Sequence, residues 1–148
     1  VPLFFTLGNA LTHKVYLSIR QRPGVSQATL SKAVGLSRQD LSWHLGKLYR
    51  ARLTTTVLDG RFRRYRASPL FDEMAQGHSK RVGRFRGMLI TALKEDNVAP
   101  SIVKSLSSSL LIRIGSGEGS TVIEVVTDPY GALLKATERA KKLTRMEK

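Results

Sequence analysis

The sequence has no cysteine and few acidic residues to balance its basic ones. The absence of cysteine excludes disulfide frameworks, cysteine-ligated zinc and thiol catalysis, and it suits a reducing, cytoplasmic location, which we therefore expect. The apolar run near the start, Val1–Leu7, is far too short to span a bilayer. It also lacks the basic start of a signal peptide.

The shortage of negative charge is concentrated in the first half of the chain. The whole sequence carries 25 Lys and Arg against 11 Asp and Glu, a formal net charge of +14, with 41% hydrophobic residues. Residues 1–68 hold 12 basic and 2 acidic residues, whereas residues 69–148 hold 13 and 9. Such an excess indicates a polyanionic partner, nucleic acid first and an anionic membrane surface second. Ser68-Pro69 is the expected seam between a domain at 1–68 and a second at 69–148.

Groups of residues typical of catalysis or metal binding are also absent. The sequence offers no Ser/His/Asp set and no carboxylate pair, and its three histidines, His13, His44 and His78, are scattered. The glycine-rich segment 115–121 lacks the lysine of a phosphate-binding loop and precedes a strand-like run rather than a helix. We therefore expect no enzyme activity, no catalytic residues, no metal and no cofactor.

The first half predicts three helices followed by a β-hairpin. The first helix is capped by Asn9 and ends at Pro23-Gly24, and the second runs from Ser26 to Val34 with Gly35 as its terminator. The third begins at Ser37 and carries an apolar stripe of Leu41, Leu45 and Leu48. The β-branched run at 54–58, an Asp-Gly turn and the run at 61–66 then predict a two-stranded hairpin.

Residues 30–45 (LSKAVGLSRQDLSWHL), 47–53 (KLYRARL) and the turn Gly60-Arg61 resemble the ArsR/MarR-type winged helix-turn-helix transcription regulators. The resemblance covers about residues 8–68 and is similar to archaeal members at Pro23-Gly24 and at residues 128–134. It implies a DNA-binding regulator that is generally dimeric. The family usually has glycine where Arg52 stands, so the end of the third helix must be built differently here. Without cysteine, the metal sensing of some ArsR proteins has no support.

The side of the third helix opposite its leucines is polar and partly basic, as expected for a helix that enters a major groove. The hairpin adds four arginines in six residues, which suits a wing on a phosphate backbone or in a minor groove. The alternatives are a solvated helix face and a solubilising strand edge. The candidate DNA-binding residues are Arg38, Gln39, Ser42, Trp43, Lys47, Arg50, Arg61, Arg63, Arg64 and Arg66.

Two residues of the third helix allow more than one interpretation. Trp43, the single tryptophan, lies opposite the leucine stripe, which favours exposure and contact with a thymine methyl or a sugar. A large aromatic side chain also commonly packs on a neighbouring element, so both readings stay open. His44 lies beside the stripe and is expected to be half-buried and hydrogen-bonded rather than a base reader.

The second half predicts a small α+β module of helix, hairpin and helix. A helix is expected over 70–95, with a break considered at Gly77, and a short helix over 100–106. Strands at 110–114 and 121–126 form the hairpin, and a last helix capped by Asp128 extends toward Leu143. The first of these helices supplies the candidate dimerisation residues Val82, Phe85, Leu89 and Leu93. The alternative is that these side chains cover the hairpin of their own chain.

The sequence therefore predicts an α+β protein, a winged helix-turn-helix followed by an α+β module. The expected function is a sequence-specific regulator that binds double-stranded DNA as a homodimer, and the sequence does not identify an effector ligand. One rival is an RNA-binding winged helix. Another is a cytoplasmic interaction module of a membrane-anchored protein, because the chain begins at Val1 with an apolar stub. In that case, membrane contact would come only through a missing upstream segment.

Overall fold

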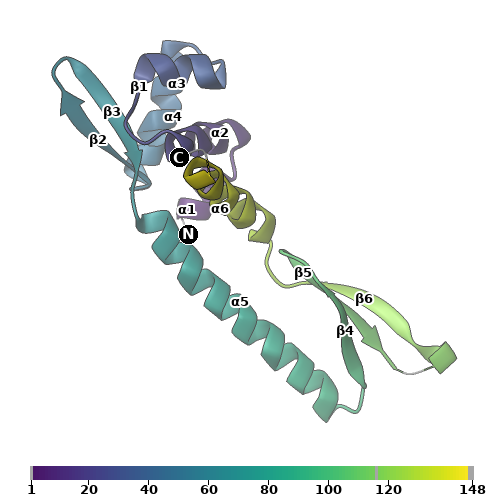
Figure 1. Ribbon diagram of the computed structural model, residues 1–148. Coiled ribbons are helices and arrows are strands. Elements are labelled where there is room, and N and C mark those ends of the chain that lie inside the picture. The colour runs from purple at the N-terminus through teal and green to yellow at the C-terminus, as the bar shows by residue number, and fades with distance from the viewer. Residues whose placement is uncertain (1, 116, 147–148) are drawn as a thin grey trace. The chain divides into compact units, whose positions relative to one another are not determined.

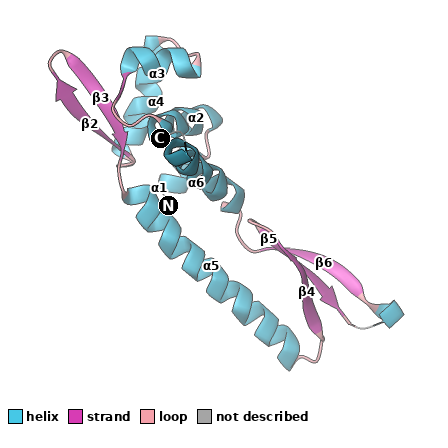
Figure 2. Cartoon of the chain, viewed as in Figure 1, coloured by secondary structure: helices cyan, strands magenta, loops and turns pink. Residues whose placement is uncertain are grey.

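The computed structural model describes residues 2–115 and 117–146, except for the side chains of Pro2 and residues 141–146. The chain divides into two compact units (Figure 1). Unit 1 contains the residues up to Glu73 together with those from Ala136 onward, and unit 2 is Met74–Lys135. Each unit has one antiparallel three-stranded sheet in addition to its helices (Figure 2). The predicted α+β class is confirmed.

Unit 1 contains the three predicted helices with their predicted caps. They are α2 (Ala10–Gln21), α3 (Gln27–Val34) and α4 (Arg38–Arg50). The side chains of Asn9, Ser26 and Ser37 accept hydrogen bonds from the backbone N–H groups that open α2, α3 and α4 respectively. Gly35 ends α3 at φ 70°, a left-handed conformation that glycine adopts without steric cost. These boundaries were predictable because capping depends on a few adjacent residues.

A short helix that the sequence analysis did not predict, α1 (Pro2–Leu7), precedes them. Its apolar side chains Leu3, Phe4 and Leu7 are buried, whereas Phe5 is exposed. This spacing of three buried positions on one side is that of an amphipathic helical turn. The apolar start of the chain is therefore part of the core of unit 1.

The core of unit 1 lies between α2 and α4. Leu41, Leu45 and Leu48 of α4 are all buried, as are Val15 and Ile19 of α2. Burying such aliphatic side chains is worth roughly 1.5–3 kcal/mol each, so this pairing fixes the outward face of α4.

The hairpin predicted after α4 is a wing in which β2 (Thr54–Asp59) pairs with β3 (Phe62–Ala67). A two-residue strand β1 (Val25–Ser26), absent from the sequence prediction, pairs with the other edge of β3 and gives the order β1-β3-β2. Because side chains alternate along a strand, Arg63 and Tyr65 share one face of β3, and Phe62, Arg64 and Arg66 share the other. The register, which sets Tyr65 opposite Thr56, orients the wing on α4.

Unit 2 begins within the long helix α5 (Leu70–Glu95), which continues through Gly77 without the break considered from sequence. The short helix predicted over 100–106 is wrong. This segment is strand β4 (Pro100–Ser105), which pairs with β5 (Ser109–Ile114), and β5 pairs with β6 (Thr121–Val126). The β-branched Ile102 and Val103 favour strand, and Pro100 occupies the first strand position on an edge, where it is tolerated. The predicted hairpin is therefore a three-stranded sheet.

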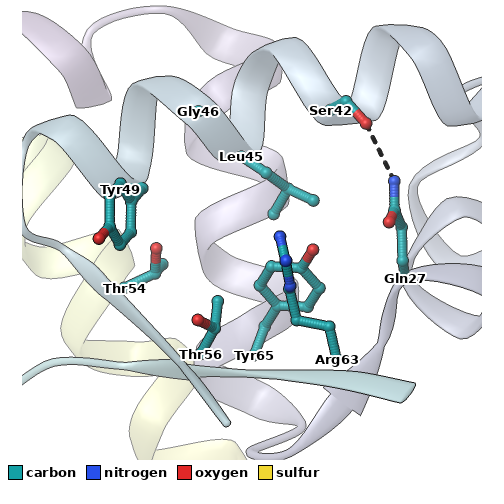
Figure 3. A pocket seen from close by; sticks show the side chains of 9 residues that line it. All are labelled: Gln27, Ser42, Leu45, Gly46, Tyr49, Thr54, Thr56, Arg63 and Tyr65. Atoms are coloured by element: carbon teal, nitrogen blue, oxygen red, sulfur yellow. Dashed lines mark hydrogen bonds between the residues drawn. The ribbon is translucent and has the colours of Figure 1, made fainter. Parts of the chain in front are cut away.

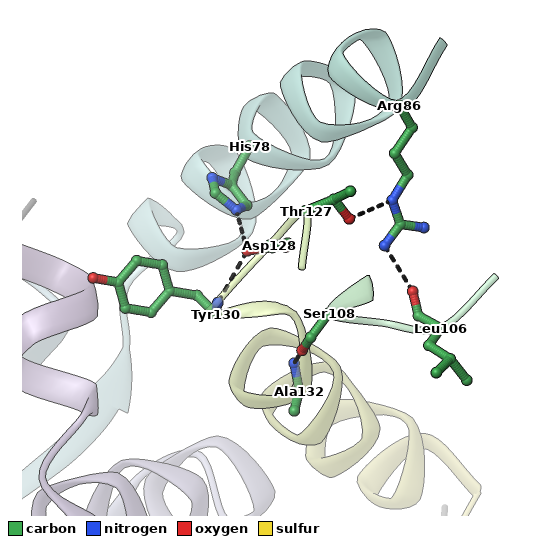
Figure 4. Close-up of polar contacts among 8 residues, drawn as sticks. All are labelled: His78, Arg86, Leu106, Ser108, Thr127, Asp128, Tyr130 and Ala132. Atoms are coloured by element: carbon green, nitrogen blue, oxygen red, sulfur yellow. Dashed lines mark hydrogen bonds and ion pairs between the residues drawn. The ribbon is translucent and has the colours of Figure 1, made fainter. Parts of the chain in front are cut away.

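Polar contacts hold one face of α5 to the segments that flank this sheet (Figure 4). The guanidinium of Arg86 donates to Thr127 Oγ1 at 2.8 Å and to the carbonyl oxygen of Leu106 at 2.7 Å. Two turns earlier, His78 Nε2 lies 2.9 Å from Asp128 Oδ1. The face of α5 that carries His78 and Arg86 is therefore covered within unit 2.

The last helix, α6 (Gly131–Met146), begins two residues later than the Asp128–Pro129 cap implies. Asp128 Oδ1 accepts from the backbone N–H of Tyr130, and Ser108 Oγ accepts from that of Ala132. Asp128 therefore forms a turn before the helix instead of capping it. The side chain of Leu143, expected on the apolar side of this helix, lies outside the described residues. No described helix is long and apolar enough to cross a membrane.

Candidate nucleic-acid interface

The outward face of α4 presents the side chains that the sequence analysis selected. Arg38, Gln39, Ser42 and Arg50 are exposed, Trp43 is 54% exposed, and Lys47 is half-buried. Gln39, Trp43 and Arg50 lie opposite the buried leucines, and Ser42 and Lys47 flank them, so the structure brings these five candidates together on one helix surface. Arg38 lies in the first turn of α4, three residues before Leu41, and is outside that surface. Gly46, in the middle of this surface, has no side chain that would project from it. A Cβ at this position would have the Arg50 guanidinium as its nearest neighbour.

Trp43 is exposed and is held in place by its neighbours on α4. The Lys47 ammonium lies 3.8 Å from the centre of its ring, a cation–π contact, and His44 meets the ring edge-on at 4.9 Å. His44 Nδ1 in turn shares a 2.8 Å hydrogen bond with Thr12 Oγ1 of α2. The expected hydrogen bond of His44 is confirmed, and its side chain is buried rather than half-buried. Burial, aided by the nearby Lys47 charge and opposed by Asp40, lowers the pKa of His44 from its ordinary value of 6.5.

The four wing arginines do not form one surface. Arg61 is exposed in the turn, and Arg63 lies on the face of β3 that also carries Tyr65. Arg64 and Arg66 lie on the opposite face. Arg64 is 3.5 Å from Asp59 Oδ2 and also donates to the carbonyl oxygen of Gly24 at 3.4 Å, so its guanidinium already has partners. The four arginines look equivalent in sequence, because composition does not reveal strand register.

A groove separates α4 from the wing, and we call it the wing groove (Figure 3). It has a volume of about 400 Å³ and is lined by Gln27, Ser42, Leu45, Gly46, Tyr49, Thr54, Thr56, Arg63 and Tyr65. Gln27 Nε2 donates to Ser42 Oγ at 3.0 Å, which links α3 to α4 across one end. Sequence reasoning missed Gln27, Tyr49, Thr54 and Thr56. The alternation of Thr54 and Thr56 on β2 was the one available signal for two of them.

The candidate dimerisation residues share one side of α5 by helical spacing but differ in exposure. Val82, Leu89 and Leu93 are half-buried and lie at helical spacing from His78 and Arg86, on the side that unit 2 covers. The side chain of Phe85 is 49% exposed, and that of its neighbour Met88 is 66% exposed. The structure therefore does not bring the four predicted side chains together on one open surface.

Within the described part of the chain, no group of three or more His, Asp or Glu residues is placed to hold a metal ion. The candidate interface is instead a helix face with an adjoining basic wing. A recognition helix of this kind meets base edges in the major groove, and wing arginines meet phosphates.

The solved structures that resemble this chain are transcription regulators. An ArsR-like transcriptional regulator from Rhodococcus is 26% identical, with a TM-score of 0.55 over 64% of this chain and 88% of that one. Reduced HlyU from Vibrio cholerae is 26% identical, with a TM-score of 0.43 over 46% and 70%. MepR, a transcription regulator from Staphylococcus aureus, is 22% identical, with a TM-score of 0.35 over 59% and 78%.

No protein-family model matches the sequence, and comparison with curated proteins gives no match. The Rhodococcus structure is of a transcriptional regulator, the class of protein that the sequence predicts. The Rhodococcus match spans most of that regulator. The predicted resemblance is therefore confirmed: the chain is similar to the winged-helix transcription regulators of the ArsR/MarR type.

Proposed function

We propose that this protein binds double-stranded DNA in a sequence-dependent manner and regulates transcription as a homodimer. The observation that carries the proposal is the exposed face of α4 opposite its buried leucines, flanked by an arginine-bearing wing. The likeness to an ArsR-like transcriptional regulator supports the same role. The proposed contacts are those of the sequence analysis, with Gln39 and Ser42 reading bases and Arg61, Arg63 and Arg66 meeting phosphates.

The proposed dimer uses the open face of α5, where Phe85 and Met88 are exposed. A shallow hollow on this face is lined by Arg84, Gly87, Met88, Thr91, Ala92 and Glu95. Arg84 and Glu95 lie at its two ends, so two antiparallel copies about a two-fold axis would set Arg84 of each opposite Glu95 of the other. A two-fold dimer would present two copies of α4 to half-sites about 34 Å apart.

Binding to duplex DNA is testable with the protein's own fluorescence, because Trp43 is the single tryptophan and lies on α4. Titration with a duplex DNA pool should change the emission of Trp43 and should saturate. A structured RNA of equal charge should bind more weakly, because a helix does not fit the narrow major groove of A-form RNA. Equal or tighter binding to the RNA would favour the RNA-binding alternative. No binding to either would refute the proposal.

A further inference from the structure

The tip of the wing, residues 57–63, exposes three large apolar side chains. Val57 is 54% exposed, Phe62 is 62% exposed and Leu58 is 72% exposed. The strand register sets Val57 opposite Arg64 and Leu58 opposite Arg63, so the apolar side chains occupy both faces of the hairpin. They therefore lie outside the core of unit 1. Neighbouring apolar side chains that stay exposed mark a surface at which another molecule binds.

The tip is also narrow and tightly closed (Figure 1). Strand β1 pairs with β3 at Arg64 and Tyr65, and beyond that point the described hairpin consists of β2 and β3 alone. Gly60, at φ 61°, and Arg61 form the two-residue turn, a connection that follows the natural twist of paired strands. The apolar side chains are therefore held at the end of a thin, two-stranded ribbon.

The charge of the hairpin indicates what kind of molecule the tip meets. Residues 54–67 include four arginines and one acidic residue, Asp59, whose Oδ2 lies 3.5 Å from Arg64 Nε. Arg61 directly precedes Phe62, so a positive charge stands beside the apolar tip. A matching partner has closely spaced negative charges around an apolar interior. Duplex DNA has this chemistry, because its phosphates flank a stack of base pairs.

The tip adjoins the surface that the proposed function assigns to DNA. Arg63, which belongs to the tip, and Ser42, on the outward side of α4, line the same wing groove (Figure 3). A duplex bound along α4 would extend past this groove to the hairpin. Charge complementarity and this continuity together favour DNA as the molecule that covers the tip.

We propose that the wing tip enters the minor groove and that Phe62 and Leu58 act as a wedge, which separates two stacked base pairs and bends the duplex. This rests on the proposed function and adds a second way of reading sequence. Apolar side chains inserted between base pairs kink DNA, at an unstacking cost that depends on the base step. Steps that unstack easily, such as TA, should therefore bind best.

A wedge differs measurably from a wing that inserts arginines alone. Arginine favours the narrow minor groove of A-tracts, which are stiff and resist unstacking. An arginine-only wing therefore prefers A-tract DNA, whereas a wedge prefers DNA rich in TA steps. The two possibilities predict preferences of opposite sign.

The test compares two duplexes of equal length and equal A·T content, one of alternating TA steps and one of A-tracts, with a donor and an acceptor fluorophore at the two ends. The wild-type chain should bind the TA duplex about tenfold more tightly and raise the energy transfer, because bending brings the ends together. Phe62→Ser and Leu58→Ser should each reduce both effects, whereas Phe62→Leu, which stays apolar, should retain them. Val126→Ser, at a comparably exposed apolar site in unit 2, is the matched control and should behave as wild type. Circular dichroism checks that each variant is folded.

The wedge is refuted if the wild-type chain prefers the A-tract duplex, or if the serine variants keep its preference and its energy transfer. An anionic bilayer shares the chemistry of the tip, so a further arm measures binding to phosphatidylserine vesicles. Vesicle binding that Phe62→Ser abolishes, with DNA bending unchanged, would assign the tip to a membrane and overturn the proposal. A chain that binds both duplexes equally and bends neither refutes the wedge alone. A chain that binds neither refutes the proposed function as well.

Discussion

Arg52, at the end of α4, occupies a left-handed backbone conformation that glycine adopts without steric cost. Its φ is 61°, its N–H donates to the carbonyl oxygen of Tyr49 at 3.0 Å, and the next N–H, of Leu53, reaches Leu48 at 3.0 Å. The left-handed conformation costs a residue with a Cβ about 1–2 kcal/mol. The end of α4 therefore forms a left-handed turn on a residue other than glycine.

Arg52→Gly should consequently stabilise the protein. We expect the free energy of unfolding to rise by about 0.5–1 kcal/mol, because relief of the left-handed strain exceeds the added entropy of glycine in the unfolded chain. Urea denaturation followed by circular dichroism measures it. Arg52→Ala removes the same side chain but keeps the Cβ, so it is the matched control and should change little. A loss of stability in Arg52→Gly would show that the arginine side chain itself stabilises the fold.

His44 makes the stability of unit 1 sensitive to acid. Burial lowers its pKa in the folded state below 6.5, so the unfolded chain binds a proton more readily than the folded chain does. Its contribution to stability is complete above pH 6.5 and is lost as the pH falls below that value. His13, whose pKa burial also lowers, acts in the same direction.

We therefore expect the melting temperature to drop between pH 7.5 and pH 5, and the drop to be smaller in His44→Gln. Glutamine can still hydrogen-bond to Thr12 but does not titrate. Thermal unfolding of both proteins at the two pH values measures the difference. An equal drop in wild type and variant would mean that His44 titrates alike in the folded and unfolded states.

At the scale of elements, predictions succeeded where the determining residues are adjacent in sequence. The caps at Asn9, Ser26 and Ser37 and the apolar stripe of α4 involve neighbours within a turn or two, and the structure contains them as expected. Strand β4 depends on pairing with β5, which local sequence does not reveal, so the prediction of a helix there was wrong. Val82 and Phe85 of α5 look alike in sequence, because both are apolar and occupy neighbouring helical positions, yet Val82 is half-buried and Phe85 is exposed. Only the position of the sheet determines which side is covered.

In the candidate site, too, features set by one element were predictable and features set by the pairing of distant elements were not. Exposure of Trp43 followed from counting around one helix, whereas the wing groove is formed by α4 and a hairpin whose register sets its lining. That register places Arg63 in the groove and Arg64 on the other face. A run of four arginines contains no information about this division.

The start of α6 depends on a close backbone approach. A Cβ on Gly131 would lie 1.9 Å from the carbonyl oxygen of Ser107, and the chain there has no flexible side chain that could move away. Gly131→Ala should therefore destabilise unit 2 by about 1–3 kcal/mol. Gly83→Ala is the control, since a Cβ on Gly83 meets nothing within 4 Å and alanine favours helix by about 1 kcal/mol. Chemical denaturation should give Gly131→Ala a lower free energy of unfolding than wild type and Gly83→Ala a higher one. Equal free energies of unfolding for the two variants would contradict this explanation of Gly131.

At the scale of the whole molecule, exchanging the charges of Arg84 and Glu95 tests the proposed dimer. Arg84→Glu alone and Glu95→Arg alone should each weaken self-association, because each places like charges opposite one another across the two-fold axis. The double variant restores opposite charges and should recover the dimer. Analytical ultracentrifugation measures all three. A double variant that is weaker than both single ones would contradict the antiparallel arrangement, and a monomeric wild type at micromolar concentration would refute the dimer.

The wing arginines are expected to contribute DNA affinity that does not depend on base sequence, because they contact phosphates. Replacing Arg63 or Arg66 by alanine should weaken binding to every duplex and reduce the salt dependence by about one phosphate each. Arg64→Ala should have a smaller effect, because its guanidinium is already paired with Asp59. Affinities measured over a range of salt concentrations give these slopes, and an equal slope for all four proteins would contradict a phosphate-binding wing.

The central claim is that α4 reads base sequence, and selection of bound duplexes from a random library tests it most directly. The wild-type chain should enrich one motif and bind it far more tightly than a scrambled duplex. Gln39→Ala and Ser42→Ala should each reduce that difference by about 1–3 kcal/mol while leaving affinity for the scrambled duplex nearly unchanged. A wild-type chain that enriches no motif, or variants that keep its full discrimination, would contradict the account.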